Sequence, residues 1–196
     1  MATIQTKSQL MTGSEIDRTL VRLAHEIIDK TTSLGQAAIV GIHRRGAVLG
    51  ERLAAKIEQL EGRPVRCGSL DITLYRDDLT TVADKPVLNG SDIPFSIAGL
   101  DVILVDDVLY TGRTTLAALE ALFHHGRARR IELCTLIDRG HRELPIEAGF
   151  VGKFVKTTDN EIIEVKLEPI DGEERVLLVE KVDENGPTRS AGRAEP

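Results

Sequence analysis

The segment Asp101–Thr115 constrains the fold of this 196-residue chain more than any other stretch. Residues 102–105 read Val-Ile-Leu-Val, and Asp106 and Asp107 follow directly. A strand of such continuous apolar character is typical of a parallel sheet that is covered on both faces. A short loop then leads into the helical pattern of residues 114–125, and ligands of open α/β sheets bind beyond the carboxyl ends of the strands. The segment therefore predicts a parallel sheet with a ligand site at this strand end.

The other apolar patterns repeat this order of strands and helices. Short apolar runs predict buried strands, and apolar spacings of three and four predict amphipathic helices. The expected strands are 37–42, 65–75 and 131–137, and the expected helices are 16–30, 46–59 and 114–125. Residues 76–92 are polar and predict a mobile loop or an exposed hairpin. The order predicts an α/β fold with a central parallel sheet flanked by helices.

The C-terminal part follows a different pattern. Residues 162–167 and 176–182 flank Asp171-Gly172 and predict an antiparallel pair of strands. The chain length fits a single domain, which we expect to span residues 1–184. Residues 185–196 have the composition of a disordered tail.

Composition and charge exclude several classes of protein. Two cysteines are too few for a disulfide scaffold or a four-cysteine zinc site, and they favour a reducing compartment. No apolar run has the length that crosses a bilayer, and the first residues lack a signal-peptide core, so we expect a cytoplasmic protein without a membrane role. The net charge of −6 argues against general nucleic-acid binding. Five Arg and three His in residues 121–142 are compatible with a local basic face, or simply with an unevenly charged solvated surface.

The loop after the 101–107 strand has the chemistry of a phosphate site beside a sugar site. Backbone N–H groups and threonine hydroxyls at a helix N-terminus bind phosphate, and Gly112 lets the backbone approach it closely. Asp106 and Asp107 suit the vicinal hydroxyls of a ribose, which need acceptors. The alternative is a plain strand-to-helix turn with capping threonines. Neither a Walker loop nor a dinucleotide fingerprint occurs at this place.

Residues 102–115 resemble the phosphoribosyl-diphosphate signature of the type I phosphoribosyltransferases. Residues 71–79 and 138–145, with Arg22–Glu26, are similar to one subgroup, the pyrimidine-operon attenuation regulators with uracil phosphoribosyltransferase activity. The resemblance runs from about residue 14 to residue 182. It implies the type I fold with a small C-terminal hood from about 150 to 182.

The resemblance implies an enzyme that makes UMP and pyrophosphate from uracil and phosphoribosyl diphosphate, with Mg²⁺ held mainly through the substrate. The catalytic residues it implies are Arg76, Asp106 and Asp107. The residues it implies for phosphoribosyl diphosphate are Arg44, Arg45, Asp106, Asp107, Val108, Leu109, Tyr110, Thr111, Gly112, Arg113, Thr114 and Thr115. Two arginines near a helix N-terminus oppose the helix dipole, so an anion is expected beside Arg44 and Arg45.

The resemblance places the base beside Asp138 and Arg139, with Val151 and Val155 in the hood. Phe154 and Lys156 stand where the family commonly has Asn and Pro, which keeps a transferase for another base as an alternative.

A messenger-RNA leader is the second partner that the resemblance implies, bound in response to the uridine nucleotides UMP and UTP. The residues it implies for RNA are Arg22, His25, His141, Arg142 and Lys153. An RNA-binding regulator with vestigial catalysis is the other alternative. The resemblance also implies a homodimer or homotetramer.

Overall fold

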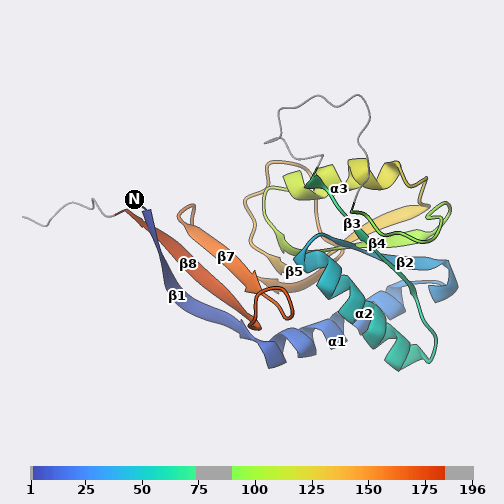
Figure 1. The fold of residues 1–196 in the computed structure, drawn as a ribbon, viewed down its shortest axis with the longest axis horizontal. Coiled ribbons are helices and arrows are strands. Elements are labelled where there is room, and N and C mark those ends of the chain that lie inside the picture. Colours follow the sequence, from blue (N-terminus) through green and yellow to red (C-terminus); the bar gives the residue numbers. More distant parts are fainter. Residues whose placement is uncertain (1, 74–89, 184–196) are drawn as a thin grey trace, which may run out of the picture.

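The computed structural model describes residues 2–73 and 90–183, and these residues form two separate sheets (Figure 1). The larger sheet has five strands in the order β3-β2-β4-β5-β6, and every neighbouring pair is parallel. Its strands are β2 (Ala37–Ile42), β3 (Arg66–Leu70), β4 (Asp101–Leu109), β5 (Arg130–Asp138) and β6 (Phe150–Phe154). The predicted parallel sheet is confirmed. Arg76, in the 76–92 segment, lies outside the described residues.

Helices cover both faces of the large sheet, as the apolar strands require. On one face lie α1 (Gly13–Lys30) and α2 (Arg45–Glu61), and on the other lies α3 (Arg113–Phe123) (Figure 1). Successive side chains of a strand point to opposite faces. Ile103 and Val105 accordingly pack with α1 and α2, whereas Val102 and Leu104 pack with α3. The type I fold expected from the sequence is therefore present, with two cores separated by one sheet.

The helices begin and end where the sequence supplies caps. The Thr12 side chain accepts from the Glu15 backbone N–H, and the Glu15 carboxylate accepts from the Thr12 backbone N–H at 2.8 Å. This reciprocal capping box satisfies two donors that a helix start leaves open. Helix α2 is followed by its C-cap residue Gly62, whose φ of 68° is unfavourable for any residue that carries a side chain.

The smaller sheet is antiparallel, in the order β1-β8-β7. It consists of β1 (Ala2–Thr12), β7 (Glu161–Lys166) and β8 (Arg175–Asp183). It extends away from the large sheet, and the N-terminus lies at its far tip (Figure 1). The predicted antiparallel pair is confirmed as β7 and β8, while β1 was not predicted from the sequence.

Three boundaries differ from the expectation. The strand expected over residues 65–75 ends at Leu70. The strand expected to end at residue 107 continues to Leu109. Residues 150–154, assigned to the hood from the sequence, form the fifth strand of the large sheet beside β5, because Phe150 is fully buried in the core below α1.

Within the two described ranges, none of the helices is both long enough and apolar enough to cross a membrane.

Candidate active site at the carboxyl edge of the large sheet

Three strand ends bring the predicted site residues to one edge of the large sheet. The end of β2 leads to Arg44 and Arg45, the end of β4 carries Asp106 and Asp107, and the end of β5 carries Asp138. The carboxyl ends of neighbouring parallel strands meet at the same edge, which is where open α/β sheets bind ligands. The sequence positions that form this group are between about 30 and 90 residues apart, and only the sheet brings them together.

Of the two adjacent carboxylates at the end of β4, Asp106 is buried and Asp107 is half-buried. Asp106 is only 7% exposed, and its Oδ1 accepts from the Asp107 backbone N–H at 2.9 Å. Burial, followed by the charge of Asp107, holds the pKa of Asp106 well above its usual range. Burial also raises the pKa of Asp107, while Asp106 and the positive charge of Arg45 act in the opposite direction. Buried carboxylates need partners, so this pair is suited to a ligand that brings hydroxyl donors or positive charge.

The loop between β4 and α3 has the geometry of an anion site. Gly112 is the N-cap of α3 with a φ of 94°, and a Cβ there would meet Leu144 and Ile146 at 3.3–3.4 Å. Thr115, in the first turn, is 3% exposed, and its Oγ1 has no hydrogen-bond partner within the described residues. A buried hydroxyl without a partner beside a helix N-terminus can donate a hydrogen bond to a bound anion. The predicted phosphate loop is therefore supported by a polar atom that the fold itself leaves unsatisfied.

The other predicted residues of this segment have distinct surroundings. The Leu109 side chain is buried in the core with α3, and Val108 packs against the core with α1 and α2, so both offer a ligand their backbone rather than their side chains. Thr111 Oγ1 accepts from the Arg113 backbone N–H at 3.3 Å, and the Arg113 guanidinium donates to Glu143 at 2.8 Å. Thr114 is exposed.

The loop after β2 approaches the acid pair very closely. A Cβ on Gly46 would lie 2.4 Å from the Val105 carbonyl oxygen, so only glycine lets the first turn of α2 rest on the end of β4. Arg44 is exposed, and the His43–Arg44 peptide bond is cis. Arg45 donates from Nε and Nη2 to the two carboxylate oxygens of Asp171, at 3.0 and 2.7 Å. The anion expected beside these arginines is thus supplied within the chain by a residue that sequence reasoning missed.

Arg139 and Tyr110 connect the phosphate loop to the smaller sheet. The Arg139 guanidinium lies 4.1 Å from the centre of the Tyr110 ring, a distance typical of a cation–π contact. The same side chain is 7% exposed and donates to the Glu161 carbonyl at 2.7 Å and to Thr157 Oγ1 at 3.0 Å. Arg139 therefore ties strand β7 to the end of β5.

Arg142 has a structural role that its sequence context did not indicate. Its Nη2 donates to Asp138 Oδ2 at 2.5 Å, and its Nη1 donates to the Tyr110 carbonyl at 2.8 Å. Its Nε donates to the Ile146 carbonyl at 2.9 Å. Arg142 thus holds the phosphate loop close to the Asp138 carboxylate at the end of β5.

A groove of about 600 Å³ lies at the end of β5, beside Asp138 and Arg142. Its lining includes Asp138, Arg139 and Val155, three of the four residues expected at the base, together with the exposed ring of Phe154. Val151 lies outside the groove, on β6, where its carbonyl oxygen accepts from Arg22 at 3.1 Å. The structure therefore brings together three of the four residues predicted to bind the nucleobase and places Val151 elsewhere.

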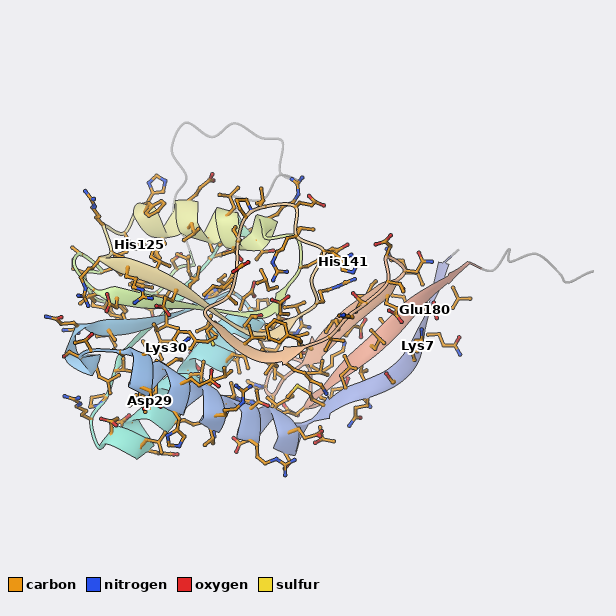
Figure 2. The ribbon with its side chains drawn as sticks, turned by 180° about the vertical axis from the view of Figure 1, so that it is seen from behind. Lys7, Asp29, Lys30, His125, His141 and Glu180 are labelled. Carbon is orange, nitrogen blue, oxygen red and sulfur yellow. The ribbon has the colours of Figure 1, made fainter. Side chains whose placement is uncertain are left out.

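The residues predicted to bind RNA fall into two places. Arg22 and His25 are exposed on α1, and Arg22 donates to the carbonyl oxygens of Val151 and Gly152 on β6. Lys153, on the same strand, donates to the Leu10 carbonyl at 2.9 Å. Arg142 and His141 instead follow β5. Figure 2 shows His141 on the side of the large sheet that adjoins the smaller sheet, with His125 at the opposite end.

Within the described ranges, no group of three or more His, Cys, Asp or Glu side chains is arranged to hold a metal ion. Asp106 and Asp107 are the two adjacent carboxylates at the site. Mg²⁺ in nucleotide enzymes is commonly held by one or two carboxylates together with substrate phosphates and water. The donor set of this site is compatible with that mode of binding.

Comparison with known proteins identifies the class first. The family model of the phosphoribosyl transferase domain matches residues 7–169. Solved structures with the same fold include a hypoxanthine phosphoribosyltransferase from Staphylococcus aureus, with a TM-score of 0.65, 22% identity, and coverage of 88% of this chain and 92% of that one. At such identity the likeness concerns the fold alone.

Curated relatives narrow the class. The "Bifunctional protein PyrR" of Pelotomaculum thermopropionicum is 54% identical over 177 residues, which is 90% of this chain and 98% of the relative. The protein of the same name from Thermus aquaticus is 54% identical over 175 residues, 89% of this chain and 97% of the relative. The chain therefore belongs to the phosphoribosyltransferase family, within the group of bifunctional PyrR proteins.

Proposed function

We propose that this protein is a uracil phosphoribosyltransferase that also binds a pyrimidine-operon messenger-RNA leader in response to uridine nucleotides. One observation carries the enzymatic part: a buried and a half-buried carboxylate lie at the same strand end as unsatisfied donors. Asp106 and Asp107 are the acceptors, and Thr115 Oγ1 with the N-terminus of α3 are the donors. A ribose 5-phosphate carries the complementary groups, hydroxyl donors on the ribose and acceptor oxygens on the phosphate.

The reaction transfers the ribosyl group of phosphoribosyl diphosphate to uracil. The bond between ribose C1′ and the diphosphate oxygen breaks, the bond from C1′ to uracil N1 forms, and the N1 proton passes to water as pyrophosphate is released. Asp106 and Asp107 accept hydrogen bonds from the 2′- and 3′-hydroxyls, and their negative charge favours the positive charge that develops on the ribose ring. Residues 110–115 bind the 5′-phosphate. Positioning and charge stabilisation of this kind supply most of the rate enhancement in such displacements.

Mg²⁺ fits as a group carried largely by the substrate. When bound, it neutralises diphosphate charge and makes that group a better leaving group. Asp106 and Asp107 are the side chains that would hold it beside the ribose hydroxyls, with their pKa values brought down by the added positive charge. Arg45 and the backbone after β2 would bind the diphosphate oxygens.

The base would occupy the groove that Asp138, Arg139 and Val155 line. Arg139 has its guanidinium committed to the Glu161 carbonyl and to Thr157, so it shapes this groove rather than reading the base with all its donors. The choice of uracil is supported by the bifunctional PyrR relatives and by the resemblance of residues 71–79 and 138–145 to the uracil-specific subgroup.

RNA binding is supported by exposed basic side chains on α1, near β6. Arg22 lies on α1 within hydrogen-bonding distance of β6, and His25 is exposed one turn further along α1. Cationic side chains bind RNA phosphates, and unpaired bases are read by local contacts. We propose that the protein acts in the cytoplasm, as a homodimer or homotetramer, and that residues 1–184 form its single domain.

The enzymatic proposal is tested by UMP formation from uracil and phosphoribosyl diphosphate with Mg²⁺. Hypoxanthine and guanine serve as parallel acceptors. Turnover with uracil alone supports the proposal. Product from a purine would make the protein another base's transferase, and no product from any base would favour a regulator with vestigial catalysis.

The RNA proposal is tested by affinity for a pyrimidine-operon leader with and without UMP. Arg22→Ala should weaken binding and reduce the slope of log affinity against log salt by about one. Arg63→Ala removes an exposed cation just after α2 and serves as the matched control. Equal losses of RNA affinity in the two variants would contradict the assignment of RNA binding to the α1 face that carries Arg22.

A further inference from the structure

Arg45 and Asp171 join two parts of the molecule that the chain keeps far apart. Arg45 is the first residue of α2, and Asp171 lies in the loop between β7 and β8, which sits beside the N-terminal end of that helix (Figure 1). Arg45 donates to both carboxylate oxygens of Asp171, at 3.0 and 2.7 Å. A two-point pair of this kind fixes the plane of the guanidinium as well as its position.

The carboxylate of Asp171 is held in place from its own side. Its Oδ2 also accepts from the Leu167 backbone N–H at 2.9 Å, and its backbone N–H donates to the Leu167 carbonyl at 2.8 Å. Only 11% of its side chain is exposed. The loop therefore presents a fixed acceptor, and Arg45 is the partner that adapts to it.

Arg45 has no comparable support from its own helix. It occupies the positive end of α2, where the helix dipole disfavours a cation. The Asp171 hydrogen bond raises the pKa of Arg45, and the nearby charge of Asp107 adds to the effect. Without Asp171, this long side chain would lose its fixed geometry and gain freedom in solvent.

The pair leaves much of the guanidinium available. A guanidinium has about five N–H donors, and Asp171 engages only Nε and Nη2. Nη1 has no partner within the described residues. An anion can therefore bind Arg45 without displacing Asp171, which distinguishes a positioning role from competition for the same donors.

We propose that Asp171 is a positioning residue for diphosphate binding: it holds Arg45 at the start of α2 so that the unused guanidinium donors meet the diphosphate of the substrate. The inference rests on the proposed function, because the proposed function assigns the diphosphate to Arg45 and the loop after β2. It also couples the smaller sheet to the substrate, because the pair joins the β7–β8 loop to the first residue of α2.

The test compares two ligands of the full-length protein by titration calorimetry with Mg²⁺. Phosphoribosyl diphosphate carries the diphosphate, and UMP does not. Asp171→Asn keeps an acceptor for Leu167 but loses the charge. It should weaken binding of phosphoribosyl diphosphate about 5- to 20-fold, less than the loss of a direct charge-assisted contact because Asp171 acts through Arg45, and leave UMP affinity within twofold.

Two further variants show whether Asp171 acts through Arg45. Glu173→Gln, in the same loop, removes a carboxylate that pairs with Arg175 instead and should change neither affinity. Arg45→Gln should weaken phosphoribosyl diphosphate binding by itself, and adding Asp171→Asn to it should cause no further loss. Arg45→Lys keeps the charge without the two-point pair and should show the same selective weakening while Asp171 is intact.

Unchanged or tighter binding of phosphoribosyl diphosphate by Asp171→Asn would overturn the inference. So would an equal loss of UMP affinity, or a second loss in the Arg45→Gln background. If the wild-type protein binds neither ligand, the proposed function itself fails. If it binds both and Asp171→Asn has no selective effect, only the positioning role fails.

Discussion

The two sheets of this protein are stabilised in different ways. In the large sheet, all six residues of β2 are buried, and β4 is buried from Val102 to Asp106. In the smaller sheet, burial alternates along β7, with Ile163 and Val165 on its inner face joining the core of α1 and α2. Ion pairs add to this apolar contact at the strands and loops. Lys7 pairs with Glu161, Arg45 with Asp171 and Arg52 with Glu174.

The difference concerns how each sheet can respond to a ligand. Apolar burial is non-directional and makes a closely packed, stiff platform. Hydrogen-bonded ion pairs depend on geometry, and one of the three, Arg45–Asp171, ends on a residue of the proposed site. The platform holds Asp106 and Asp107 still, whereas Arg45 and Arg139 connect the smaller sheet to the same edge.

The largest effect is expected from the acid pair on the platform. Asp107→Asn should lower the rate of UMP formation at least about 100-fold, the scale of losing one preorganised charged contact in a transition state. Initial rates with uracil and phosphoribosyl diphosphate measure it. Asp101→Asn, at the start of the same strand and paired with Arg129, is the control and should keep its activity. A normal rate for Asp107→Asn would remove this residue from the mechanism.

Shortening a leucine side chain should lower the free energy of unfolding more in the large sheet than in the smaller one. Leu104 is fully buried in the large sheet, and Leu104→Ala should lower the free energy of unfolding by about 2–5 kcal/mol. Leu178 is only half-buried on β8, so Leu178→Ala should cost clearly less. Urea denaturation of both variants measures the two values. Equal losses would contradict the contrast between the sheets.

Asp106→Asn should stabilise the protein while impairing transfer. Burial raises the folded-state pKa of Asp106, so its contribution to stability is present below its unfolded pKa and is lost as pH rises through the folded pKa. The variant should therefore melt a few degrees higher than the wild type near pH 8, with the gap narrowing toward pH 4. A gap that grows on acidification would show that Asp106 is stabilised as a carboxylate in the free protein.

The smallest effect is expected from the smaller sheet, where Figure 2 labels Lys7 and Glu180. The Lys7 ammonium, followed by the Thr158 backbone N–H, lowers the pKa of Glu161 to about 2. The stabilising contribution of Glu161 is thus present above its ordinary pKa and is lost as pH falls toward about 2. Glu161→Gln should melt slightly below the wild type at neutral pH and match it near pH 2. The Lys7 side chain is 50% exposed, so the difference at neutral pH should be small.

How much the sequence predicts follows the same division between the sheets. The strands of the large sheet and the helices on it were predictable because their apolar periods are unbroken. Strand β1 was not, because its register shifts between Thr6 and Ser8 and between Gln9 and Met11, and these irregularities interrupt the alternation that marks a strand. Strand β6 is short and contains Gly152, so it gave little signal of a place in the core sheet.

The candidate site was predictable where its residues are contiguous. Asp106, Asp107 and residues 110–115 lie in one segment, and their local chemistry indicates a phosphate beside a sugar. Asp171 was missed as a site residue because its partner Arg45 is 126 residues away and no local pattern connects them. The intramolecular contacts of Arg142 were missed for the same reason, since its contact with Tyr110 spans 32 residues.

Hydrogen–deuterium exchange with and without phosphoribosyl diphosphate and Mg²⁺ tests most directly whether the stiff platform and the linked smaller sheet meet at one substrate site. Amides 110–116 and 167–173 should gain protection when the ligand is bound. Amides 102–105, already inside the buried sheet, should not change. Protection that spares both loops, or that appears only in β4, would contradict this account of the molecule.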